Sequence, residues 1–497
     1  MAQSIKKLFS DSVIYGLSSI VGRFLNYLLV PLYTYRITAS SGGYGQITNI
    51  YAYTALLLVI LTFGMETTFF YFANRQGANA RQVFSTAACS VGMVSMFFAL
   101  SVIIFIHPIA SALGYESHPE YLRIMAVVVA LDAFQSIFFA WLRYEGRAWK
   151  FAFLKLFFII TNIGLNLFVF LVAPRWSASG VAIVGWYRPE HLVRYVFLIN
   201  LICTATVTLG FIPELKNLRF GIDHGLLRSM LRYTWPLLLL GIVGILNQVA
   251  DKICFRFLVP GHEGDVQLGI YGACVKIAMI MAMITQAFRY AYEPFVFGNS
   301  RDSKSKESQA QVMRYFVIFT LLAYLTVVCT MEILKHIIQR QYWEGLDVVP
   351  IVMLAEIFMG IYFNLSFWYK LTEKTWWGAI MSGIGCAVML SVNILFVPRY
   401  GYRACAWGGF AGYAVCMVLS YCIGQRHYRI PYAVGPLTIY FGAALLLASA
   451  ARAIHIDNDW ICTIVRCTLI LPYLAVVAVM ERDTLKGVSK RLFRRTA

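Results

Sequence analysis

The chain has 497 residues, of which 60% are hydrophobic and only 13% are charged. A soluble domain carries about 25% charged residues, so the composition excludes a soluble protein, and it equally excludes a disordered, collagen-like or coiled-coil chain. The 42 Lys and Arg outnumber the 24 Asp and Glu, but they are scattered between apolar runs, which argues against nucleic acid as a partner. We expect an integral membrane protein.

Apolar segments long enough to cross a bilayer follow one another along the whole chain. The first follows the basic segment MAQSIKKLFS without a small-residue cleavage site, so we expect an uncleaved span rather than a signal peptide. The sequence predicts an all-α integral membrane protein of about fourteen transmembrane helices. They are expected near residues 12–33, 46–72, 83–106, 121–142, 151–173, 192–212, 233–257, 268–297, 314–334, 347–369, 376–397, 404–424, 433–452 and 460–480.

The short connections between these spans are unequally charged. If the N-terminus is cytoplasmic, the inner segments hold about three times as many Lys and Arg as the outer loops. The positive-inside rule therefore predicts that both termini lie in the cytoplasm. The basic tail from Lys486 to Arg495 is expected to lie against anionic lipid.

A weak internal repeat relates the two halves of the chain. The letters IVG at 20–22 recur at 242–244, and Tyr44-Gly45 is echoed by Leu268-Gly269. Two parallel repeats would form two pseudo-symmetric six-helix bundles with the substrate between them. The predicted parts are an N-lobe at 1–212, a C-lobe at 213–424, and two C-terminal helices with the basic tail at 425–497.

Polar and charged residues inside the spans identify a candidate site. A charge at the bilayer centre costs about 2.5–3.5 kcal/mol, so each one requires a reason. The first, fifth, seventh and eighth spans each carry polar residues on one helical face. The predicted cavity residues are Arg23, Asn26, Lys155, Asn162, Asn166, Asn247, Lys276, Gln286 and Arg289.

Alternative explanations apply to several of these residues. Lys155 lies near the end of its span, where it could reach the headgroups, and Arg289 could pair with Glu293 four residues later. Asp251 and Glu293 are candidates for ion coupling or for partners of nearby cations. The sequence leaves open whether Lys276 or Arg289 faces the cavity. A net positive cleft would favour a phosphate or a carboxylate.

Other classes of function fit less well. The eleven cysteines lie almost all in apolar segments without a CxxC pair, so they are interpreted as core or lipid-facing residues, and no metal or cofactor is expected. An enzyme would need acid and base groups at an aqueous face. The outer loops are short, and acids such as Glu190, Glu263 and Asp265 are interpreted as ordinary solvated loop charges.

Three passages are similar to a known family: GMETTFF at 64–70, QAFRY with EPF within 286–295, and NLSFWYKLT at 364–372. With the 6+6+2 pattern of spans, the chain resembles the multidrug/oligosaccharidyl-lipid/polysaccharide exporter superfamily. Within it, the chain looks most like the bacterial polysaccharide-biosynthesis flippases for O-antigen or capsule repeat units. The resemblance covers essentially the whole chain.

This resemblance implies a transporter rather than an enzyme. It would move an undecaprenyl-diphosphate-linked oligosaccharide across the bacterial inner membrane by alternating access, and could contact a glycan polymerase or glycosyltransferases. Lipid II flippases of the superfamily have essential basic residues in spans one and eight, where Arg23 and either Lys276 or Arg289 lie here. The alternative is a cation-coupled multidrug or small-molecule antiporter, in which Asp251 would carry the cation. The sequence does not identify the glycan.

Overall fold

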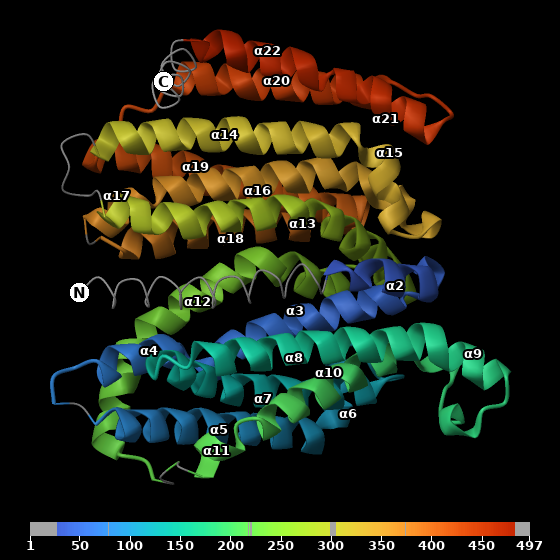
Figure 1. The fold of residues 1–497 in the computed structure, drawn as a ribbon, viewed down its shortest axis with the longest axis vertical. Helices are drawn as coiled ribbons and strands as arrows, with labels where there is room; N and C mark the ends of the chain where they lie inside the picture. The colour runs from blue at the N-terminus through green and yellow to red at the C-terminus, as the bar shows by residue number, and fades with distance from the viewer. Residues whose placement is uncertain are drawn as a thin grey trace, which may run out of the picture. The chain divides into compact units, whose positions relative to one another are not determined.

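The computed structural model describes residues 27–77, 79–216, 218, 221–298, 305–372 and 374–482, except the side chains of 290, 291, 293–295, 297, 298 and 305. All regular elements of these residues are helices (Figure 1). Thirteen helices in this part of the chain are long and apolar enough to cross a membrane, and they match the second to fourteenth predicted spans. The prediction of an all-α membrane fold is confirmed. Most of the first predicted span lies outside the described residues.

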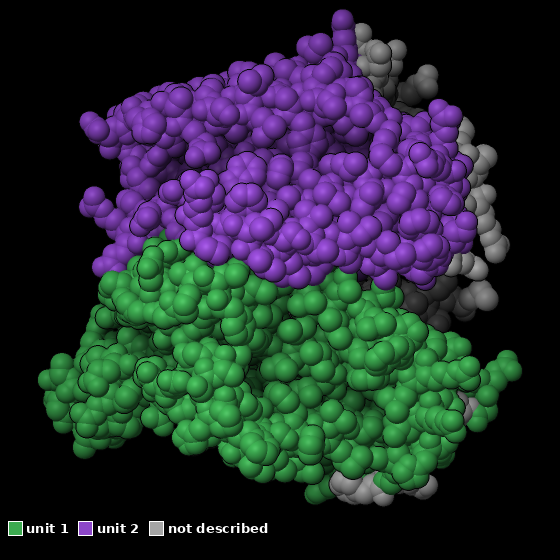
Figure 2. All heavy atoms as spheres, turned by 180° about the vertical axis from the view of Figure 1, so that it is seen from behind, with its two compact units in different colours: residues 1–272 green, residues 273–497 purple. Residues whose placement is uncertain are grey.

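The chain forms two compact units, residues 1–272 and 273–497, which Figure 2 distinguishes by colour. The first unit contains α2 (Leu29–Arg36), η1 (Ala39–Ser41), α3 (Gly43–Thr62), α4 (Met65–Ala73), α5 (Ala80–Ile104), α6 (Ile106–Ala112), α7 (Pro119–Tyr144), α8 (Ala148–Leu167), η2 (Phe168–Val172), α9 (Ala173–Ala178), η3 (Ala182–Val184), η4 (Pro189–His191), α10 (Leu192–Leu209), α11 (Ile212–Lys216), α12 (His224–Leu258) and the first part of α13 (Gly261–Gly298).

The second unit contains the rest of α13 and the elements α14 (Ser305–Cys329), α15 (Met331–Leu334), η5 (Lys335–Ile337), η6 (Arg340–Asp347), α16 (Val348–Leu365), α17 (Phe367–Leu371), α18 (Trp376–Tyr400), α19 (Tyr402–His427), α20 (Val434–Ala453), α21 (Asp459–Thr468) and α22 (Ile470–Met480). The units therefore divide inside α13, and α12 belongs to the first unit. The lobe boundaries expected from the repeat, 212 and 424, stay a prediction.

In the first unit, α7 packs against α3, α5, α8 and α10. Its side chains Ala133, Ile137 and Phe138 are fully buried, and Phe138 contacts the rings of Phe84 and Phe211. Lipid is as apolar as these side chains, so close van der Waals packing rather than water exclusion stabilises the contact. This packing fixes α7 at the core of the unit.

The second predicted span is broken into α3 and α4. Phe63 and Gly64 both have positive φ, 53° and 67°, and Phe63 is the one non-glycine residue of the described chain with this property. The break leaves the Phe63 carbonyl outside the helical hydrogen-bond ladder, and the Thr234 hydroxyl of α12 donates a hydrogen bond to it. The Phe63 carbonyl therefore has a hydrogen-bond partner on another helix. A polar backbone group within lipid requires such a partner.

The helices α3 and α13 cross at two glycines. A Cβ on Gly45 would lie 1.9 Å from the Asp265 carbonyl oxygen, and a Cβ on Gly269 would lie 3.0 Å from the Gly45 nitrogen. Only glycine permits so close a backbone approach. Gly45 and Gly269 are also the pair that the sequence repeat equates.

In the second unit, α19 packs against α16 and α18, while α14 packs against α16 and α20. The C-terminal helices are held by polar contacts as well as by packing. The Tyr440 hydroxyl of α20 donates to Glu481 Oε1 at 2.7 Å, and Arg314 of α14 forms an ion pair with the same carboxylate.

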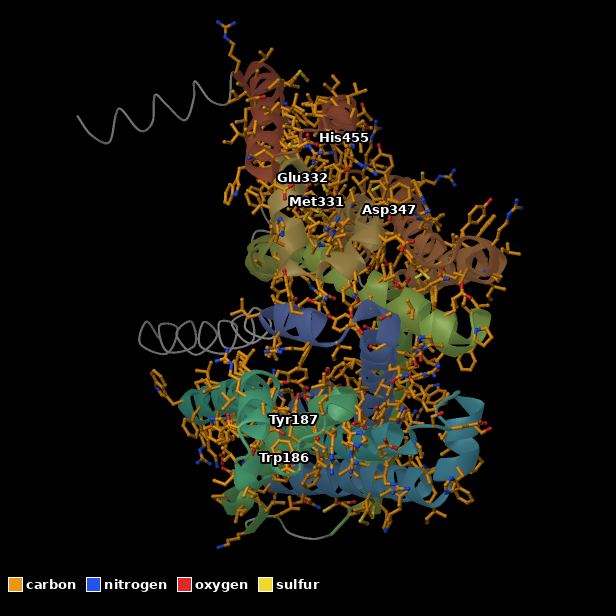
Figure 3. All side chains as sticks on the ribbon, turned by 90° about the vertical axis from the view of Figure 1, so that its right-hand side faces the viewer. Trp186, Tyr187, Met331, Glu332, Asp347 and His455 are labelled. Carbon is orange, nitrogen blue, oxygen red and sulfur yellow. The ribbon has the colours of Figure 1, made fainter. Side chains whose placement is uncertain are left out.

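A second ionic cluster joins α15 and η5 to α21. Glu332, labelled on α15 in Figure 3, accepts from Lys335 Nζ at 2.5 Å and pairs with Arg466 at 2.9 Å. Lys335 also bonds Asp459 at 2.8 Å, and Arg466 donates to the Ile454 carbonyl, next to the labelled His455. The cluster fixes the connection between α20 and α21.

Candidate functional site

The structure allows most of the predicted cavity residues to be placed. Arg23 and Asn26 lie outside the described residues, and the side chain of Glu293 is not described. The first unit holds Lys155, Asn162, Asn166, Asn247 and Asp251, and the second holds Lys276, Gln286 and Arg289.

Two cations share one aromatic ring in the second unit. The exposed guanidinium of Arg289 lies 4.5 Å from the centroid of the Phe363 ring, and Lys370 Nζ lies 4.6 Å from the same centroid. Lys370 is also 4.8 Å from the Phe367 ring. The two positive charges are separated by no more than the sum of their distances to the shared ring. An aromatic face attracts a cation without neutralising it, so this arrangement concentrates positive charge.

The ring of Phe363 contacts cations from two other helices. Arg289 lies on α13, Phe363 near the end of α16, and Lys370 on α17. Phe288, Tyr292 and Phe367 pack beside them, with ring centroids 5.2 Å apart for the first pair and 5.1 Å apart for the second. Buried apolar packing therefore fixes the segment that carries Arg289.

Lys276 and Gln286 occupy other positions on α13, and both are partly buried. Gln286 is three residues before Arg289, which places it on the same helical face. Lys276 is thirteen residues before Arg289, or about 20 Å along the helix at 1.5 Å per residue. One small anionic group can therefore contact Arg289 and Gln286 together, but not Arg289 and Lys276.

Asn162 and Asn166 use their amides within the first unit. Asn166 is fully buried, its amide nitrogen donates to the Asn162 carbonyl at 2.8 Å, and its Oδ1 accepts from the Tyr33 hydroxyl at 2.8 Å. Asn162 is 4% exposed. In this conformation the two asparagines join α2 to α8 rather than facing solvent.

Asp251 is a paired carboxylate. It is 6% exposed, accepts from Lys252 Nζ at 2.9 Å on both oxygens, and accepts from the Tyr271 hydroxyl at 2.8 Å. Asn247, one turn earlier on α12, is partly exposed, and its amide donates to the Val243 carbonyl at 2.9 Å. The ammonium group of Lys252 therefore compensates the negative charge of Asp251.

The interpretation of Asp265 as a solvated loop charge is wrong. Asp265 lies in the first turns of α13, is 3% exposed, and accepts from Gln46 Nε2 at 2.9 Å. Arg256 lies 3.4 Å from the same oxygen and stands over the Tyr115 ring at 3.7 Å. The close glycine crossing buries the acid, and burial requires these partners.

Two functional candidates were not identified from the sequence. Asp132 is a single acid in the middle of α7, where Thr204 Oγ1 donates to it at 3.2 Å and where it interacts electrostatically with Lys155. Lys370 lies in the passage at 364–372 but was not among the predicted cavity residues. Its proximity to Arg289 depends on the folding of α17 against α13. No group of three or more His, Cys, Asp or Glu that could hold a metal occurs in the part of the chain that the structure describes.

Comparison with known protein families shows the family to which this chain belongs. Residues 39–350 match the family described as "Polysaccharide biosynthesis protein", which is more than half of the chain. The chain belongs to this polysaccharide biosynthesis family. A protein of the Lsg locus of Haemophilus influenzae is similar to it, with 20% identity over 328 residues that cover 64% of this chain and 72% of that protein.

Solved structures show the fold of this family member. The lipid II flippase MurJ in an inward closed conformation has a TM-score of 0.70 at 14% identity, and the match covers 96% of this chain and 100% of that chain. An inward-facing multidrug resistance transporter of the MATE family has a TM-score of 0.61 at 14% identity, covering 84% and 97%. The chain therefore has the fold of these two transporters.

The three passages that carried the family resemblance occupy structurally important positions. The passage at 64–70 begins at the break between α3 and α4, and its Glu66 forms an ion pair with Arg143 of α7. The passages at 286–295 and 364–372 pack together around Phe367 and supply Arg289 and Lys370. The cation pair of this family member is therefore built from two of the three passages.

Proposed function

We propose that this protein flips an undecaprenyl-diphosphate-linked oligosaccharide, a repeat unit of a surface polysaccharide such as O-antigen or capsule, across the bacterial inner membrane by alternating access. Membership of the polysaccharide biosynthesis family supports the substrate class. The observation that carries the proposal is the pair of cations, Arg289 and Lys370, beside Phe363.

A diphosphate suits this pair for electrostatic reasons. Charge-assisted hydrogen bonds from a guanidinium to phosphate oxygens are strong and directional. An aromatic ring carries no net charge, so it attracts the two cations without cancelling their positive charge. Gln286, on the same face of α13, would offer a hydrogen bond to a sugar hydroxyl. The polyprenyl chain would remain in the lipid, because a hydrocarbon chain is well solvated there.

The remaining predicted residues have less direct roles in this proposal. Arg23, Asn26, Lys155, Asn247 and Lys276 would line the path of the headgroup. Asn162 and Asn166 would reach the substrate only where α2 moves away from α8, because their amides now bond within the protein. Asp251 would hold the Lys252 charge in place. Loop charge supports cytoplasmic termini, and a polymerase or glycosyltransferases would act beside the protein.

Cells that lack the gene and carry a variant copy provide the test. Arg289→Ala should reduce surface polysaccharide and cause the lipid-linked precursor to accumulate, while Arg289→Lys should retain part of the activity. The matched control is Arg399→Ala, since Arg399 is also exposed and stands over a tyrosine ring, 5.5 Å from its centroid, but lies at the end of α18. Normal polysaccharide with Arg289→Ala at wild-type abundance would contradict the assignment.

The same cells separate the flippase from a drug antiporter. A deletion strain that keeps its polysaccharide but becomes sensitive to cationic drugs would favour the antiporter, whose fold is shared. We expect the opposite result, because the cation pair would repel a cationic drug.

A further inference from the structure

A second charged centre lies inside the first unit. Asp132 is half-buried in the middle of α7, and the Thr204 hydroxyl of α10 donates to its Oδ1 at 3.2 Å. Two titratable groups face it from other helices, Lys155 of α8 and the Tyr51 hydroxyl of α3, and both interact with it electrostatically. A carboxyl group within an apolar span requires such partners or a function.

Lys155 interacts electrostatically with Asp132 and with a second acid. Its Nζ is 4.0 Å from the centroid of the Phe139 ring, and its charge interacts with Asp132, with Glu66 and with Arg143. Glu66 and Arg143 form an ion pair whose side chains are 45% and 31% exposed. Titratable groups therefore run from the exposed Glu66, through Lys155, to the interior Asp132.

Asp132 differs from Asp251, another interior acid of the first unit, in how its charge is compensated. Asp251 receives Lys252 Nζ on both oxygens at 2.9 Å. For Asp132, no cation among the described residues lies within the 4.0 Å of an ion pair, so Lys155 acts on it only through space. Protonating Asp251 would remove a direct ion pair, whereas protonating Asp132 would not.

We propose that Asp132 is a proton-binding site and that Lys155 and Glu66 connect it to the aqueous phase. Binding adds one proton to the Asp132 carboxylate and changes the charge of the Asp132–Lys155 pair from zero to +1. Release returns the proton to water through the exposed Glu66, and no other bond changes. The coupling of this proton to export rests on the proposed function, while the binding of the proton does not.

Infrared difference spectroscopy of the purified full-length protein in lipid, recorded between acidic and alkaline pH, tests the site directly. The wild type should show the carbonyl band of a protonated carboxyl, and Asp132→Asn should lose it. Asp251→Asn is the matched control and should keep the band. Lys155→Gln should strengthen the band at neutral pH, because removal of the cation favours the neutral acid. A spectrum that Asp132→Asn leaves unchanged would overturn the proposal.

Export measurements separate this proposal from the proposed function. Asp132→Asn, at wild-type abundance and thermal stability, should lose surface polysaccharide, and Asp132→Glu should restore part of it. Full export by Asp132→Asn would refute coupling through Asp132. If deletion of the gene leaves polysaccharide unchanged but the band still depends on Asp132, the proposed function fails and the proton site stands.

Discussion

Replacing Gly45 with alanine tests the crossing of α3 and α13. The new Cβ would lie 1.9 Å from the Asp265 carbonyl oxygen and 2.9 Å from the Gly269 nitrogen. Both are backbone atoms, so no side-chain rotation relieves the overlap, and the two helices must separate. Inserting one methyl group into a tightly packed contact costs about 1–3 kcal/mol. We therefore expect Gly45→Ala to lower the free energy of unfolding by this amount.

Gly164→Ala is the matched control for this substitution. Gly164 lies within α8 of the same unit, and a Cβ there would meet no described heavy atom within 4 Å. Alanine is favoured over glycine in a helix by about 0.5–1 kcal/mol, so this variant should be as stable as the wild type or more stable. Equilibrium unfolding of both proteins in mixed micelles measures the difference. Equal stability of Gly45→Ala and Gly164→Ala would refute the close crossing.

Two further predictions concern ionic contacts. The buried Glu214 carboxylate lies 2.7 Å from the Arg147 guanidinium and 2.6 Å from the Lys150 ammonium. Glu214→Gln removes the negative charge that both cations contact. Because both cations reach solvent, we expect unfolding measurements to show a loss of about 1–3 kcal/mol, below the cost for a fully buried pair. Burial alone would lower the pKa of Lys335, but hydrogen bonds from its ammonium, including one to Asp459, raise the pKa above its usual value. This stabilisation is present at neutral pH and is lost as pH rises through the raised pKa. We therefore expect Lys335→Met to unfold at a lower temperature than the wild type at neutral pH, and we expect this difference to disappear at strongly alkaline pH.

Each of these results has a clear contrary outcome. Wild-type stability of Glu214→Gln at low salt would mean that the buried carboxylate does not hold the two cations. A deficit of Lys335→Met that persists undiminished at strongly alkaline pH would mean that the charge of the ammonium is not what stabilises α21.

Local sequence patterns predict the spans but not the contacts between them. Thirteen predicted spans are helices because long apolar runs in lipid must satisfy their backbone groups internally. The break at Phe63 was missed, although Gly64 could have indicated it, since glycine readily adopts positive φ. The hydrogen bond from Tyr33 to Asn166 joins residues 133 positions apart. A local sequence pattern cannot indicate a contact between residues so far apart in the chain, so the burial of Asn166 could not be predicted.

The residues of the candidate site could likewise be predicted only in part, because their contacts depend on the fold. Arg289 was identified because a charge within a span requires a function, and Asp132 carried the same signal but lacked a polar stripe beside it. Lys370 became a candidate only when the fold brought it to the ring that Arg289 also contacts. Asp265 lies near the end of a predicted loop, and its burial depends on the glycine crossing with α3.

Translocation by the purified protein in liposomes tests the central claim most directly. A fluorescent polyprenyl-diphosphate oligosaccharide in the inner leaflet should become accessible to a membrane-impermeant quencher, more slowly with Arg289→Ala. A polyprenyl glycan without the diphosphate should not move. Equal movement of both lipids, or no movement of either by an intact protein, would contradict recognition of the diphosphate by the cation pair.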